Sequence, residues 1–219
     1  MDLTPVLISC KTASASIAAT FFLGLLAAAW VAGMRNRFWK MMLDGLLTLP
    51  LVLPPTVAGF FLLYIFGLRG PIGIFFINLF GIKIAFSWGA TVLAATLISF
   101  PLMYRSARGA LEQVDPELIY AARTLGMSET RIFWKISLPT ALPGIAGGAV
   151  LAFARGLGEF GATAMIAGNI AGRTRTLPLA IYSETAAGNM NEAGRYVLII
   201  VLFSFMVVAL MNYFSGKKQ

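Results

Sequence analysis

Arg155 and Glu159 are the charged residues whose spacing points most directly to chemistry in this sequence. Side chains four positions apart face the same side of a helix and can form an ion pair. An uncompensated charge at the centre of a bilayer costs about 3 kcal/mol, and these residues follow a long apolar run. We therefore expect Arg155 and Glu159 to pair. The alternative is that they line a gate.

The sequence offers no set of groups for catalysis or metal binding. It has no histidine and one cysteine, Cys10, which excludes an internal disulfide and the usual soft-metal ligand sets. No carboxylate lies deep within an apolar run, as an intramembrane enzyme would require. The phosphate-binding pattern GxxxxGK[ST] is also absent, so the chain does not bind ATP in the usual way. We expect a non-catalytic protein without a cofactor.

The elements that must position these residues are apolar helices. The chain has 219 residues, of which 58% are hydrophobic and 12% are charged, a composition outside the range of soluble domains. A helix needs about 20 apolar residues to cross a bilayer. Five uncharged runs are long enough: 12–32, 45–68, 84–104, 136–154 and 196–216. The sequence therefore predicts an all-α integral membrane protein, residues 1–219 as one domain, with five transmembrane helices.

Two shorter apolar runs leave the number of spans open between five and six. Residues 70–82 and 160–172 fall below spanning length and favour interfacial or re-entrant segments. Prolines lie in or beside the spans and can kink them. These are Pro50, Pro54, Pro55, Pro101, Pro139 and Pro143. Small residues recur at helical spacing in the fourth span, where they permit close helix packing: Gly144, Gly147, Gly148 and Ala152.

The basic residues predict the orientation of the chain. With five spans the termini face opposite sides, and Lys and Arg favour the cytoplasm. Segments 33–44, 105–135 and 217–219 carry ten basic residues, against six on the other side. We expect a plasma membrane protein with its N-terminus outside and its C-terminus in the cytoplasm. The basic residues are spread along loops and form no single soluble face, so nucleic-acid binding is not expected.

The cytoplasmic segment 105–135 carries the clearest local signals. Asp115 suits a helix N-cap, Pro116 the first helical position, Glu117 the positive end of the dipole and Gly126 the position after the helix. An apolar stripe is formed by Leu118, Ala121, Ala122 and Leu125, with Glu117 and Arg123 off it. A second short helix is expected after Ser128. The stripe packs either on its own protein or in a groove of a cytoplasmic partner.

Several residues of this segment resemble a known signature. Ala121, Ala122, Gly126, Ile136, Leu138 and Pro139 match the EAA loop of ATP-binding-cassette importer permeases. Tyr120 stands where that family has Glu, so any contact of that carboxylate is absent or supplied by another residue, such as Glu117. Segments 49–60, 85–115, 137–163 and 168–182 closely resemble the permease subunit of molybdate importers; sulfate and methionine permeases are related alternatives.

The resemblance implies the type I importer fold, a homodimeric pore in membrane lipid, and two kinds of partner. Cytoplasmic ATPase subunits would sit on the EAA loops, which form coupling helices, and an extracytoplasmic binding protein would deliver the oxyanion. Residues implied in coupling are Leu118, Ala121, Ala122, Arg123, Leu125 and Gly126. Passage of an oxyanion needs donors without tight binding. We therefore expect 160–177 to form the outer mouth and gate, with Arg155, Glu159, Thr163, Asn169, Arg173 and Arg175; ordinary solvated arginines are the alternative. A self-contained channel or carrier would not need the docking helix.

Overall fold

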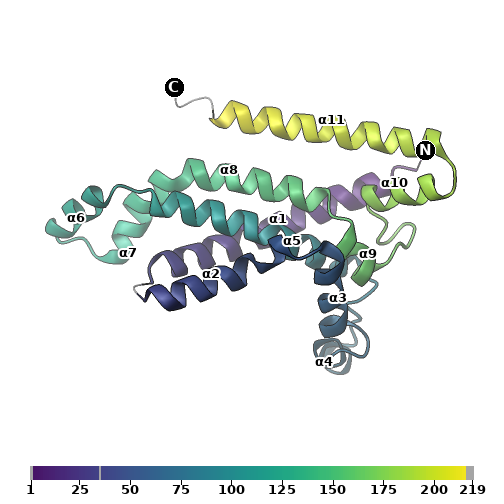
Figure 1. Ribbon diagram of the computed structural model, residues 1–219, viewed down its shortest axis with the longest axis horizontal. Coiled ribbons are helices and arrows are strands. Elements are labelled where there is room, and N and C mark those ends of the chain that lie inside the picture. The colour runs from purple at the N-terminus through teal and green to yellow at the C-terminus, as the bar shows by residue number, and fades with distance from the viewer. Residues whose placement is uncertain (1, 35, 216–219) are drawn as a thin grey trace.

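The computed structural model describes residues 2–34 and 36–215, and these are almost wholly helical, with no strand among them (Figure 1). The helices are α1 Thr4–Ala32, α2 Arg37–Val52, α3 Pro55–Phe66, α4 Pro71–Phe80, α5 Trp88–Glu112, α6 Pro116–Thr124, α7 Glu129–Ile132, the π-helical η1 Phe133–Ser137, α8 Leu138–Leu157, α9 Gly161–Ala167, α10 Leu177–Ala186 and α11 Met190–Ser215.

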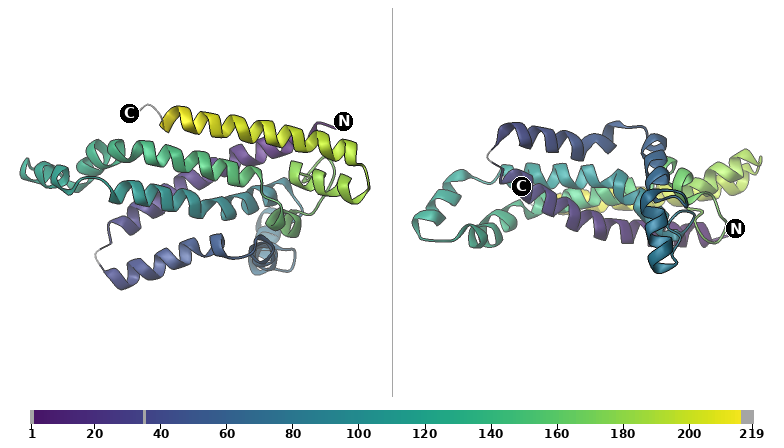
Figure 2. Two further views of the ribbon diagram at one scale, coloured as in Figure 1. Left: turned by 45° about the horizontal axis from the view of Figure 1, so that its top comes forward. Right: turned by 90° about the horizontal axis from the view of Figure 1, so that it is seen from below.

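Helices α1, α5 and α8 form the centre of the molecule (Figures 1 and 2). Their facing sides share a buried cluster that is rich in alanine and includes Val31, Met103, Tyr104 and Ile145. Hydroxyl groups join α1 to α5 as well: Thr12 Oγ1 lies 2.9 Å from Thr91 Oγ1, and Thr20 Oγ1 lies 3.1 Å from Ser99 Oγ. Small side chains let these helices approach, and the hydroxyl pairs satisfy polar groups that have no access to water.

Two glycines of the predicted small-residue stripe lie at the contact between α8 and α5. A Cβ atom at Gly144 would lie 2.7 Å from Ala110 Cβ, and one at Gly148 would lie 2.9 Å from Ser106 Oγ. A Cβ at Gly147 would have no heavy atom within 4 Å. Close packing therefore depends on Gly144 and Gly148, and not on Gly147.

The predicted span 45–68 is broken at its prolines and is not one straight helix. Helices α2 and α3 meet at an angle of 108°. Leu53 has extended dihedral angles, φ −66° and ψ 138°, because Pro54 disfavours the helical conformation in the residue before it. Pro54 also has no N–H to continue the helix, and Pro55 then starts α3. The described residues thus contain four helices long and apolar enough to span, or five spans if the bent pair counts as one.

The other spans are present with shifted boundaries. Helix α1 starts eight residues before the uncharged run because Lys11 is tolerated on it, with its Nζ 4.4 Å from the centre of the Trp88 ring. The helix expected after Ser128 begins there, at Glu129, but it is continuous with the fourth span, because α7, η1 and α8 run on as one helix, Glu129–Leu157. The fifth span starts at Met190 in α11, and the predicted end at residue 216 lies outside the described residues.

The π-helical turn at Phe133–Ser137 lies where α7 passes into α8. The Leu138 N–H donates to the Phe133 carbonyl five residues earlier. The next residue, Pro139, has no N–H with which to continue the α-helical pattern. A wider turn of this kind adds one residue to the helix without breaking it.

Candidate coupling helix and outer gate

Helix α6 forms the far tip of the molecule, beyond the ends of α5 and α8 (Figure 1). Its predicted ends are confirmed. Asp115 is the N-cap and its Oδ1 accepts a hydrogen bond from the Glu117 N–H at 2.9 Å. Gly126 follows the helix with a φ of +76°, a left-handed conformation in which glycine is unstrained. The short helix is therefore held by its own caps.

The apolar stripe of α6 divides between two sides. Ala122 is buried, and its neighbour Ile119 packs against the central cluster. Leu118 is 48% exposed and Leu125 is 82% exposed, and Ala121 is exposed as well. Three of the four stripe residues are thus uncovered in the single chain. A helix tip that exposes leucines outside the bundle has an unpartnered apolar surface.

Arg123 ties α6 to the start of the helix that follows. Its Nε donates to Glu129 Oε1 at 2.6 Å and its Nη2 donates to Glu129 Oε2 at 3.0 Å. The hydrogen bond to Glu129 raises the pKa of Arg123. A two-point contact between a guanidinium and a carboxylate fixes orientation as well as distance. Arg123 therefore holds α6 at a set angle to α7, and does not point away as a free cation.

At the opposite end of the bundle, Arg155 and Glu159 form the expected pair, with 3.1 Å between Arg155 Nη1 and Glu159 Oε2. Glu159 is buried, and its Oε1 accepts a hydrogen bond from the Ala162 N–H at 2.8 Å. Ala162 belongs to α9, which packs closely on α3: a Cβ at Gly59 would lie 2.7 Å from the Ala162 Cα. Glu159 thus anchors the start of α9 beside α3.

Of the other residues predicted for the gate, the structure brings Asn169 and Arg175 into contact, whereas Thr163 lies apart from them. Arg175 Nε donates to Asn169 Oδ1 at 2.9 Å, which closes the loop between α9 and α10. Arg173 is exposed on the same loop, whereas Thr163 is buried within α9 and does not join the surface. The α6 residues predicted to act in coupling and the loop residues predicted for the gate lie at opposite ends of the bundle (Figures 1 and 2). Among the described residues no group of three possible metal ligands occurs.

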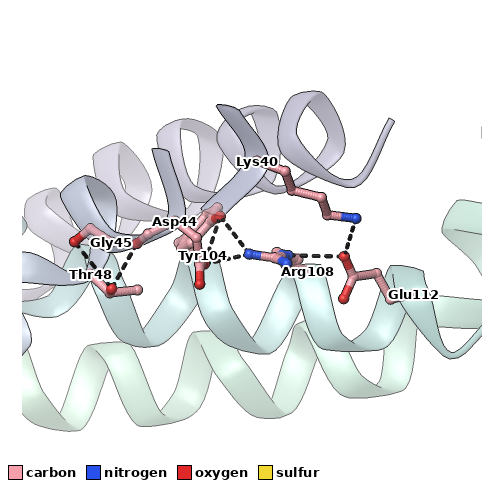
Figure 3. Close-up of polar contacts among 7 residues, drawn as sticks. All are labelled: Lys40, Asp44, Gly45, Thr48, Tyr104, Arg108 and Glu112. Carbon is pink, nitrogen blue, oxygen red and sulfur yellow. Dashed lines mark hydrogen bonds and ion pairs between the residues drawn. The ribbon is translucent and has the colours of Figure 1, made fainter. Parts of the chain in front are cut away.

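One polar cluster was missed by the sequence analysis, and it joins α2 to α5 (Figure 3). Arg108 Nε lies 2.9 Å from Glu112 Oε1, and its Nη1 contacts Asp44 Oδ1. Lys40 Nζ lies 2.8 Å from the same Glu112 oxygen. The Tyr104 hydroxyl donates to Asp44 Oδ1 at 3.1 Å. The signal that could have shown it is the four-residue spacing of Lys40 with Asp44 and of Arg108 with Glu112, which puts each pair on one helix face.

Comparison with known proteins gives consistent matches. The family model for the binding-protein-dependent transport system inner membrane component matches residues 21–217. The molybdenum transport system permease protein ModB of Escherichia coli strain K12 is 47% identical over 208 residues, covering 94% of this chain and 89% of that protein. The protein of the same name from Haemophilus influenzae is 39% identical over 220 residues, covering 100% and 96%.

The fold also matches a solved structure. A chain of the MetNI methionine ABC transporter, in an inward-facing conformation, superimposes with a TM-score of 0.71 and 18% identity, over 96% of this chain and 94% of that one. At this identity the match shows the fold alone, which is that of an importer permease.

Proposed function

Because the chain belongs to the family of binding-protein-dependent transport system inner membrane components, we propose that it is the permease subunit of an ATP-driven importer that carries molybdate into the cytoplasm. The assignment of molybdate as the substrate is supported by the similarity to permeases named for molybdenum transport, which extends over nearly the whole length of both chains. The chain supplies the pore and no catalysis; a partner subunit hydrolyses ATP.

We propose that α6 is the docking site of the ATPase subunit. Leu118, Ala121 and Leu125 offer an apolar surface that this protomer leaves uncovered, while the caps and the Arg123–Glu129 contact hold the helix rigid. A preformed helix loses little conformational freedom when the ATPase subunit binds, which favours tight binding. The end of the bundle that carries α6 is then cytoplasmic, α11 runs toward that side, and α1 starts on the outer side (Figure 1).

A substitution on α6 tests the docking site. Leu125→Glu places a charge in the apolar contact and should abolish co-purification of the ATPase subunit without lowering the thermal stability of the permease, because Leu125 is 82% exposed. Met190→Glu is the matched control, since it adds the same charge to an apolar residue that is 65% exposed at the other end of the bundle. Unchanged co-purification of the Leu125→Glu variant would contradict docking at α6.

We propose that the segment from residue 160 to 177, which comprises α9 and the loop after it, forms the outer mouth and gate, where Arg173 and Arg175 attract the dianion or face the docked binding protein. Both lie in the loop between α9 and α10, and Arg175 is oriented by Asn169. Replacing both arginines with Gln should reduce uptake but leave assembly intact. Arg195→Gln is the control, because this exposed arginine pairs with Glu192 on α11. Uptake equal to that of the control would exclude a role for the two arginines.

We propose that two copies form the pore. The exposed apolar side chains of α3, α4 and α11 need lipid or a second protomer to cover them. The substrate is tested with the complex of permease, ATPase and binding protein in liposomes, by comparing ATP hydrolysis stimulated by molybdate, tungstate and sulfate. Molybdate should stimulate at the lowest concentration. Equal stimulation by all three anions would contradict the molybdate assignment and leave the importer assignment standing.

A further inference from the structure

Helix α2 is held to the rest of the protein in an unusual way. None of its 16 residues is buried. Its apolar contacts with the central cluster come from two half-buried leucines, Leu43 and Leu47. Apolar contact is not directional, so two leucines alone would let α2 slide or turn along α5. What fixes the register of α2 is the polar cluster of Lys40, Asp44, Tyr104, Arg108 and Glu112 (Figure 3).

Arg108 is the centre of this cluster. It contacts carboxylates from both helices, Asp44 on α2 and Glu112 on α5. Its side chain is 18% exposed, less than those of its two partners, at 34% and 38%. Charge-assisted hydrogen bonds are stronger and more directional than neutral ones, and a connected network is worth more than isolated surface pairs. Removing Arg108 would leave Asp44 without a cation, and only the Lys40–Glu112 pair and the Tyr104–Asp44 hydrogen bond would still join the charged groups of α2 to α5.

The cluster lies beside the segment that leads into the coupling helix. Only Gln113 and Val114 separate Glu112 from the N-cap Asp115, and Val114 is buried in the central cluster. Because this connection is short and packed, a displacement of α6 also displaces the end of α5. At its other end α2 turns through 108° into α3, which packs on α9. Helix α5 also contacts α9 directly, and a second path to α9, through α2 and α3, operates only if α2 moves with α5.

We propose that Arg108 is a positioning residue that ties α2 to the coupling end of α5, so that α2 and α3 follow α5 when the ATPase moves α6. This inference rests on the proposed function. The contacts of Arg108 with Asp44 and Glu112 stay intact throughout the transport cycle. They therefore make α2 move together with α5. Arg108 neither contacts the substrate nor docks the ATPase.

The proposal is tested with Arg108→Gln in the reconstituted complex. Basal ATP hydrolysis should be retained, and the number of molybdate ions imported per ATP should fall at least about tenfold, which corresponds to about 1.4 kcal/mol. Arg108→Lys should restore part of the coupling, since an ammonium can still contact one carboxylate. Arg105→Gln is the matched control: it removes a cation from the same helix end, and Arg105 has no ion pair within the described residues. Coupling in Arg108→Gln equal to that in Arg105→Gln would overturn the proposal.

A cross-link between α2 and α5 distinguishes helices that stay together during transport from helices that must separate. In a Cys10→Ser background, Lys40→Cys and Glu112→Cys are joined by a short bifunctional thiol reagent. Joining α2 to α5 should keep or raise the uptake of this variant. Loss of uptake on cross-linking, with recovery after cleavage, would show that the helices separate during the cycle and would overturn the proposal. If the unmodified complex itself imports no molybdate with ATP, the proposed function fails instead.

Discussion

Substituting Gly148 tests whether α8 and α5 pack as closely as the structure shows. In Gly148→Ala the new Cβ would lie 2.9 Å from Ser106 Oγ and closer still to Ser106 Cβ. Atoms at that separation must move apart, and because Ser106 Cβ is attached directly to the α5 backbone, the helices must move with them. Overpacking of this kind costs about 1–3 kcal/mol.

Gly147→Ala is the matched control, because its Cβ would meet no heavy atom within 4 Å. Both substitutions gain the same helix propensity, about 1 kcal/mol, so this gain cancels in the comparison. The difference in stability between the two variants is therefore the packing cost of about 1–3 kcal/mol. For a chain of this length that corresponds to a melting temperature about 2–12 °C lower for Gly148→Ala than for Gly147→Ala.

The assay is thermal unfolding of the purified permease in detergent, followed by tryptophan fluorescence. Ser106→Gly removes the atoms that the new methyl group meets, so the double variant Ser106→Gly/Gly148→Ala should melt higher than the sum of the two single changes predicts. Equal melting temperatures for Gly147→Ala and Gly148→Ala, or no gain in the double variant, would refute the close contact of α8 with α5.

Substitutions at three further positions probe local features. Glu159→Ala should cost about 1–3 kcal/mol in thermal unfolding because the buried Ala162 N–H loses its acceptor, and Glu159→Gln should cost less because its amide oxygen still accepts; equal losses would contradict this role. Asp115→Ala should cost α6 about 1 kcal/mol and speed amide exchange in residues 116–124 alone, whereas faster exchange throughout the chain would argue against a local cap. Gly126→Ala should cost about 1–2 kcal/mol in the same exchange measurement, since its φ is +76°, and unaltered exchange would rule out the left-handed turn.

The ends of α6 could be predicted from the sequence because capping is local. Asp115, Pro116 and Gly126 act within a few residues of the helix ends that they set, so no tertiary information was needed. The bend between α2 and α3 was predictable in principle from the pair Pro54–Pro55. Both prolines were expected to kink this span, but a count of uncharged residues gives only the length of a run and not the angle of 108° at which its two helices meet.

The cluster around Arg108 could not be predicted in the same way. Asp44 and Tyr104 are 60 positions apart, and nothing local to either residue specifies that α2 lies on α5. The four-residue spacings show only that each pair shares a helix face. The same applies to the outer loop, where the contact of Arg175 with Asn169 depends on how the chain folds back between α9 and α10. The residue types predicted that Arg175 and Asn169 belong to one outer segment, but they did not predict that the two side chains contact each other.

The π-helical turn at Phe133–Ser137 sets the rotational phase between α7, which leads from the α6 tip, and the fourth membrane helix, α8. Each residue of an α-helix turns the chain by about 100°, so removing one residue from this turn would restore regular winding and swing Glu129–Ile132 to another side of the axis. The carboxylate of Glu129 would then no longer face Arg123. A change of one residue in the length of this turn would therefore change the direction in which the exposed leucines of α6 point.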